Sequence, residues 1–120
     1  MKPAWCILAG ESWLGGPLVL SIADVGMSGQ MDGFNVVLHE FAHKLDMLNG
    51  DANGFPPLHR GMNAAAWAHD FSTAYEDLCA RVDGGEDTAI DPYASTDPAE
   101  FFAVLTEVFF ETPDVLHAEY

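Results

Sequence analysis

His39, Glu40 and His43 form one H-E-x-x-H pattern within residues 37–50. On an α-helix, side chains four residues apart lie on the same face, so the two imidazoles can converge on one tetrahedral metal ion. Glu40 is displaced by about 100° around the helix and can reach a water on that ion rather than the ion itself. The pattern therefore indicates a zinc-binding helix. The plainer interpretation is a buried helix that happens to contain two histidines.

A catalytic zinc ion needs a third protein ligand and an open position for water. Glu100 and Glu107 are seven residues apart, on nearly the same face of an expected helix, and both could point at the H-E-x-x-H helix. Glu100 also has a purely structural explanation, because Asp97 and Glu100 form a capping-box pattern by themselves. Spacing alone leaves the choice between the two glutamates open.

Cysteine is the other candidate third ligand. Cys6 and Cys79 are isolated in the sequence, and a lone cysteine is more often a small buried hydrophobe than a ligand. A cysteine ligand would favour a deformylase-like hydrolase, which shares the H-E-x-x-H pattern and is a third, weaker interpretation. A surface or hydrogen-bonded role is favoured for the remaining histidines, which are His59, His69 and His117.

The expected H-E-x-x-H helix is apolar on more than one side, which predicts that it is buried. One apolar face gathers Phe34, Phe41, Leu45 and Leu48. Asp46 lies near the histidines on this helix. Its carboxylate is either an outer acceptor that orients an imidazole or a solvated helix carboxylate, and both interpretations stay open.

Three helices are expected in the elements that position these residues. The first covers residues 34–48 and is closed by Asn49 and Gly50, the second covers residues 63–82, and the third covers residues 97–111, with Asp97 as N-cap and Pro98 in the first turn. Residues 51–59 and 91–93 are expected to be loops. Residues 17–23, and residues 5–8, have β-type composition. We expect one domain over residues 1–120, of α+β class, with a few short strands and about three main helices.

The net charge and the cysteine content limit the partners and the cellular compartment that we expect. The chain of 120 residues has 4 Lys and Arg against 19 Asp and Glu, a formal net charge of -15, which disfavours nucleic acid and anionic membrane surfaces as partners. The same charge would attract basic peptides, although a well solvated acidic surface is the plainer interpretation. The two cysteines form no disulfide framework, and the short apolar run at residues 4–9 is no adequate signal peptide. We therefore expect a cytoplasmic protein, and the oligomeric state stays open.

Four longer stretches resemble a known family. GESW at residues 10–13, GPLVLS at 16–21, FNVVLHEFAHKLDMLNGDANGFPPL at 34–58 and IDPYASTDPAEFFAVLTEVFFETP at 90–113 together look like the Mlc titration factor A family. The resemblance implies a zinc metallopeptidase of the gluzincin type, similar at its catalytic core to anthrax lethal factor. The chain is short relative to that family, whose first-named member binds the glucose repressor Mlc.

The resemblance also implies roles for individual residues. The family's zinc ligands correspond to His39, His43 and Glu100, and Glu100 is identified through the D-P-A-E motif. The base that activates water corresponds to Glu40, and the active-site tyrosine corresponds to Tyr93. Without it, Tyr93 would be a loop aromatic. The expected function is peptide-bond hydrolysis with one Zn²⁺ per chain, with aminopeptidase and endopeptidase action both open. The alternative is a weakly catalytic or non-catalytic zinc module that binds a transcriptional repressor of the Mlc type.

Overall fold

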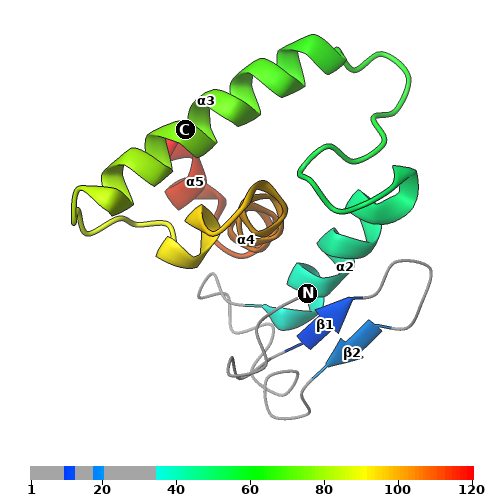
Figure 1. Cartoon of the computed structure of the whole chain (residues 1–120), viewed down its shortest axis with the longest axis horizontal. Coiled ribbons are helices and arrows are strands. Elements are labelled where there is room, and N and C mark those ends of the chain that lie inside the picture. Colours follow the sequence, from blue (N-terminus) through cyan, green and yellow to red (C-terminus); the bar gives the residue numbers. More distant parts are fainter. Residues whose placement is uncertain (1–9, 13–17, 21–34) are drawn as a thin grey trace.

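A computed structural model describes residues 10–12, 18–20 and 35–120. In Figure 1, α4 lies between α2 and α3. The elements in chain order are β1 (Gly10–Ser12), β2 (Leu18–Leu20), α2 (Val36–Asp46), the 3-10 turn η1 (Met47–Asn49), α3 (Ala64–Asp83), the 3-10 turn η2 (Pro92–Ser95), α4 (Pro98–Glu111) and α5 (Pro113–Glu119). In the described part of the chain, no helix is long and apolar enough to cross a membrane.

The fold is helical, so the expected α+β class is wrong. Residues 35–120 are organised by four α-helices instead of about three, and β1 and β2 are strands of only three residues each. They pair antiparallel, with Glu11 opposite Val19. Such a short ribbon does not form a layer of the domain, and the buried hydrophobic cluster of the described residues comes from the helices and the α3–α4 connection. The strand expected at residues 5–8 lies outside the described residues.

The helices expected from local signals are confirmed with small shifts at their ends. The side chains of Asn35, Asn63 and Asp97 cap α2, α3 and α4, each accepting a hydrogen bond from the backbone N–H three residues later. Of residues 91–93, expected to be irregular, Asp91 caps the 3-10 turn η2, and Pro92 and Tyr93 lie within it. Helix α5 was not expected. It is tied to α3 by the guanidinium of Arg81, which donates to Glu119 at 2.8 Å.

The outer face of α2 differs from the prediction. Phe41, Leu45 and Leu48 were expected to be buried, but they are 58%, 48% and 71% exposed, and Phe34 lies outside the described residues. The buried face of α2 instead carries both histidines, Glu40, Ala42 and Asp46. Polar residues occupy the inner face because α4 presents buried carboxylates to it, a pairing that the apolar pattern of one helix does not reveal.

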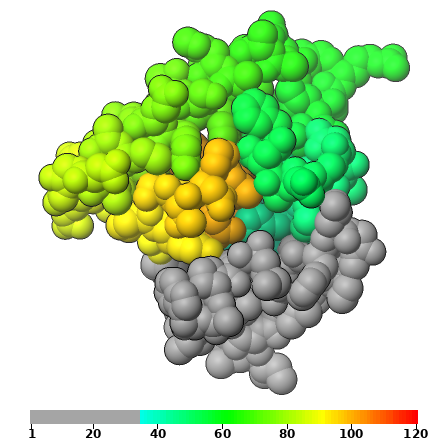
Figure 2. All heavy atoms as spheres, viewed as in Figure 1, coloured from blue at the N-terminus to red at the C-terminus, as the bar shows by residue number. Residues whose placement is uncertain are grey.

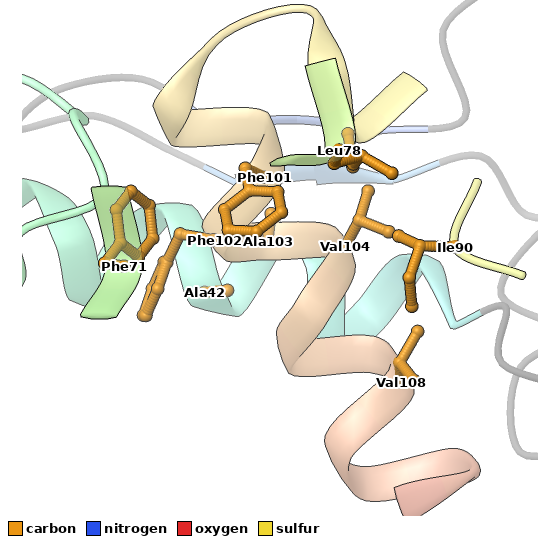
Figure 3. Packing of buried hydrophobic residues seen from close by; sticks show 10 residues of the cluster. Ala42, Phe71, Leu78, Ile90, Phe101, Phe102, Ala103, Val104 and Val108 are labelled. Atoms are coloured by element: carbon orange, nitrogen blue, oxygen red, sulfur yellow. The ribbon is translucent and has the colours of Figure 1, made fainter. Parts of the chain in front are cut away.

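Side chains of α4 fill the centre of the core (Figure 3). Phe101 lies against Phe71 and Tyr75 of α3, with ring centroids 5.2 and 5.3 Å apart. The other buried hydrophobic residues of the cluster are Ala42, Leu78, Ile90, Ala94, Phe102, Ala103, Val104 and Val108. Residues 35–120 thus form one continuous body (Figure 2), and its aromatic contacts fix α4 in place.

Gly54 joins the loop after η1 to three helices. Its N–H donates to Asp46 Oδ2 at 2.7 Å, and its carbonyl accepts from the indole of Trp67 at 3.1 Å. Its φ of +84° lies in the left-handed region. A Cβ at this position would lie 2.3 Å from the ring of Phe71 and 2.9 Å from the carbonyl oxygen of Pro98. Only glycine therefore fits this position.

Gly54→Ala is expected to destabilise the fold by more than about 2 kcal/mol, because the strained φ and the overlap with backbone add to each other. The free energy of unfolding, measured by urea denaturation, checks this. Gly50→Ala is the matched control, since Gly50 also has a positive φ but an added Cβ would meet nothing within 4 Å. Equal losses in the two variants would show that close packing around Gly54 does not matter.

Candidate active site

Two antiparallel helices bring the candidate ligands together. His39 and His43 lie one turn apart on α2, and Glu100 lies in the first turn of α4. One possible ligand atom from each of the three side chains lies within 4.8 Å of the others, and all three residues are buried. Among the described residues, this is the one group of histidine, cysteine, aspartate and glutamate found close enough to hold a metal ion.

The carboxylate of Glu100 faces one nitrogen of each imidazole. Its Oε1 lies 2.6 Å from His43 Nε2, and its Oε2 lies 3.4 Å from His39 Nε2. Both His39 Nε2 and Glu100 Oε2 are buried without a hydrogen-bond partner. Buried polar atoms are costly in this state unless something else satisfies them. Two imidazoles and a carboxylate whose possible ligand atoms lie within 4.8 Å of one another fit a metal ion.

The pKa values of His39 and Glu100 reflect these contacts. Burial alone would lower the pKa of His39, but the carboxylates of Glu100 and Glu107 outweigh it and raise the pKa to about 9. For Glu100, burial would raise the pKa, yet the neighbouring side chains of His39, His43 and Tyr93 hold it well below its usual range. These contacts therefore favour the ionised form of the Glu100 carboxylate, which is the form able to bind a metal ion.

The structure distinguishes the contacts of Glu100 from those of Glu107, which spacing along the helix does not. Glu107 does not lie on the Nε2 side of His39. Its Oε2 lies 2.9 Å from the other ring nitrogen, Nδ1. Glu100 therefore belongs to the group with the two histidines, and Glu107 contacts His39 at Nδ1, the ring nitrogen that does not face Glu100.

Glu40 and Tyr93 lie beside this group. Glu40 follows His39 on α2 and is 1% exposed. Tyr93 is in η2, with its ring centroid 6.3 Å from that of His39, and its side chain hydrogen-bonds Glu100. The turn η2 is fixed by its own cap and by its packing on α4 and α3. Tyr93 therefore comes to this group from a third element, separate from α2 and α4.

The other candidates do not join the group. Cys79 on α3 contacts the carbonyl of Ser95 through its Sγ at 3.8 Å, and Cys6 lies outside the described residues. Asp46 is fully buried rather than solvated, and its Oδ2 accepts from Gly54, so it supports the loop after η1 and makes no hydrogen bond to an imidazole in the described structure. The remaining histidines, His59, His69 and His117, are exposed.

A partly buried polar network beyond Glu107 was not predicted from the sequence. The side-chain amide of Asn35 donates to Glu111 Oε1 at 2.6 Å, and its backbone N–H donates to Glu107 Oε1 at 2.7 Å. The signal that could have found it is the spacing of three glutamates, at positions 100, 107 and 111, on one face of an otherwise apolar helix. Carboxylates repeated on a buried face need partners.

Comparison with known proteins gives one family and a set of close relatives. Residues 4–120 match the model of the family described as glucose-regulated metallo-peptidase M90. The chain is 49% identical over 113 residues to a protein of Serratia proteamaculans called Mlc titration factor A, and 45% identical over 111 residues to the protein of that name from Escherichia fergusonii. A Yersinia pestis protein of the same name is 43% identical over 117 residues.

These alignments cover most of this chain but less than half of each relative. They take in 92%, 91% and 95% of the chain, against 43%, 42% and 43% of the three relatives. The matched part contains the three clustered side chains, together with Glu40 and Tyr93.

Proposed function

The chain belongs to the glucose-regulated metallopeptidase family M90, and we propose that it is a zinc-dependent peptidase that hydrolyses peptide bonds with a water activated at His39, His43 and Glu100. The observation that carries the proposal is the convergence of these three buried side chains from two helices, with Glu40 next to His39 on the same helix. The match to a metallopeptidase family supports the same reaction class.

The donor set favours zinc among the divalent metals. Two imidazole nitrogens and one carboxylate oxygen form a recurrent catalytic zinc set, in which a fourth position is left for water. Bound there, zinc would supply a Lewis acid that lowers the pKa of a water toward neutrality and polarises the scissile carbonyl. Mg²⁺ and Ca²⁺ prefer sites made entirely of oxygen ligands, which this group does not offer.

The protein side chains would then move the proton and hold the developing charge. The carboxylate of Glu40 accepts a proton from the attacking water and later donates it to the leaving amine. The hydroxyl of Tyr93 donates a hydrogen bond to the oxyanion that forms on the scissile carbonyl. The influence of Tyr93 on the pKa of Glu100, and the 6.3 Å between the ring centroids of Tyr93 and His39, support this role.

Tyr93→Phe is expected to lower kcat by about 100-fold and to leave zinc content unchanged, because it removes one donor to the oxyanion without removing a ligand. Steady-state kinetics on a cleaved peptide, together with metal analysis, check this. Tyr75→Phe is the matched control, since Tyr75 lies on α3 and its hydroxyl donates to the carbonyl of Ser95. A Tyr93→Phe enzyme with wild-type kcat would remove Tyr93 from the mechanism.

A peptide library tests the function itself. Zinc-loaded chain is incubated with peptides of mixed sequence, and new termini are identified by mass spectrometry. The net charge of -15 predicts that peptides rich in Lys and Arg are cleaved before acidic ones. The positions of the cuts distinguish removal of terminal residues from internal cleavage. Absence of any cleavage by chain that retains its zinc would reject the peptidase assignment.

A second candidate function is binding to a transcriptional repressor. It is favoured by the name of the relatives, Mlc titration factor A, at 43–49% identity. The chain spans less than half of their length, so retention of this partner is a separate proposal. Titration of a purified Mlc-type repressor with the Glu40→Gln chain, followed by light scattering, tests it independently of hydrolysis. A complex would support the proposal, and two unchanged masses would reject it.

A further inference from the structure

The imidazole of His39 is held from both edges by carboxylates of α4. On one edge, Nε2 faces Glu100 Oε2 at 3.4 Å. On the other, Nδ1 lies 2.9 Å from Glu107 Oε2 in a buried hydrogen bond. An imidazole is rigid, so a bond that fixes Nδ1 also fixes the direction in which Nε2 points. Glu107 contacts the nitrogen that no metal bound beside Glu100 would use.

We propose that Glu107 is the positioning residue of this site, and that its hydrogen bond to Nδ1 keeps Nε2 of His39 directed at the metal. This inference rests on the proposed metal site but not on peptide hydrolysis. A carboxylate that accepts from the outer nitrogen of a ligating histidine fixes the ring orientation and makes the imidazole a better donor to the metal. Glu107 is therefore neither a ligand nor part of the proton transfer.

The Glu107 carboxylate is itself fixed in place. Its second oxygen, Oε1, accepts the backbone N–H of Asn35 at 2.7 Å, at the N-terminal cap of α2. Asn35 is held in turn by Glu111 at 2.6 Å. Both oxygens of Glu107 thus act as acceptors, one for His39 and one for the start of the helix that carries His39. Glu107 therefore ties the metal-ligand helix to α4 at two points.

This double use makes Glu107→Gln an informative change. Glutamine has nearly the same shape, but one of its two terminal atoms is an NH₂ group that donates and does not accept. The amide can therefore serve either His39 or Asn35, but not both. Glu111→Gln is the matched control, because Glu111 is 5% exposed, lies one turn further on the same helix and contacts Asn35 without touching His39.

The experiment measures zinc affinity by competition with a chromophoric chelator at fixed pH, in the wild-type chain and in both variants. Glu107→Gln is expected to bind one Zn²⁺ per chain about 10- to 100-fold more weakly, and Glu111→Gln to bind it nearly as the wild type does. The visible spectrum of Co²⁺-loaded protein should change in Glu107→Gln alone, since only there does the orientation of a ligand change. Glu107→Ala with Glu111→Ala repeats the comparison if a glutamine variant does not fold.

Each outcome bears on a different claim. Equal affinities and spectra in the two variants would overturn the positioning role. Complete loss of stoichiometric metal in Glu107→Gln, as for removal of a ligand, would overturn it in favour of direct coordination. A wild-type chain that binds zinc and cleaves no peptide would reject the proposed hydrolysis while the affinity comparison still decides the role of Glu107.

Discussion

Glu40→Gln is expected to lower peptide turnover by about 1,000-fold while the chain keeps its zinc, because the amide cannot take a proton from the attacking water. Glu40 is 1% exposed and follows a candidate ligand on α2, so the isosteric glutamine should disturb the packing little. The measurement pairs kcat on a cleaved peptide with elemental metal analysis of the same sample. Loss of rate without loss of metal would identify a base rather than a ligand.

An exposed glutamate supplies the control for this variant. Glu76 is exposed on α3, a helix that carries none of the three candidate ligands, so Glu76→Gln makes the same chemical change there and should leave kcat and metal content as in the wild type. Turnover by Glu40→Gln at the wild-type rate would remove Glu40 from the mechanism. It would also raise the question of whether a contaminating peptidase produced the activity.

Glu100→Gln is expected to weaken zinc binding by more than about 100-fold, which exceeds the effect typical of a residue that only orients a ligand. The carboxylate lies between two imidazoles at 2.6 and 3.4 Å, and the amide replaces its negative charge with a neutral oxygen. Chelator competition gives the affinity, and peptide turnover at limiting zinc should fall in parallel. A wild-type dissociation constant for zinc in this variant would show that Glu100 is not a ligand.

The sequence predicts the helices well, because the signals that start and end them are local. Asn63 caps α3 and Asp97 caps α4, close to where the sequence predicts that these helices begin. Pro98 lies in the first turn of α4, as predicted. The spacing of His39 and His43 likewise depends only on the geometry of one helix. These features need no knowledge of which elements lie side by side.

The choice between Glu100 and Glu107 could not be made in this way. Residues seven apart on a helix share a face, so spacing allows both to face α2, and both contact histidines of that helix. What separates them is the opposite direction of α2 and α4, which places Glu100 beside His43 and Glu107 near the start of α2. That arrangement is tertiary. The family resemblance pointed to Glu100 where spacing did not.

The two failures of the sequence-based view have a common origin. The exposed face of α2 was expected to be buried because it is apolar, and the α+β class was expected because short β-type runs precede that helix. Both predictions relied on the hydrophobic pattern within one segment and did not include the elements that pack against it. Leu48 is 71% exposed, whereas Asp46, two residues earlier, is fully buried, where it accepts the backbone N–H of Gly54.

The most direct test of the metal site is the zinc content of the wild-type chain, measured by elemental mass spectrometry on protein purified without a metal-binding tag. We predict about one zinc per chain, removed by a strong chelator together with peptide turnover and restored with it when zinc is added back. A folded chain that holds no zinc after reconstitution would contradict the assignment of His39, His43 and Glu100 as a catalytic metal site.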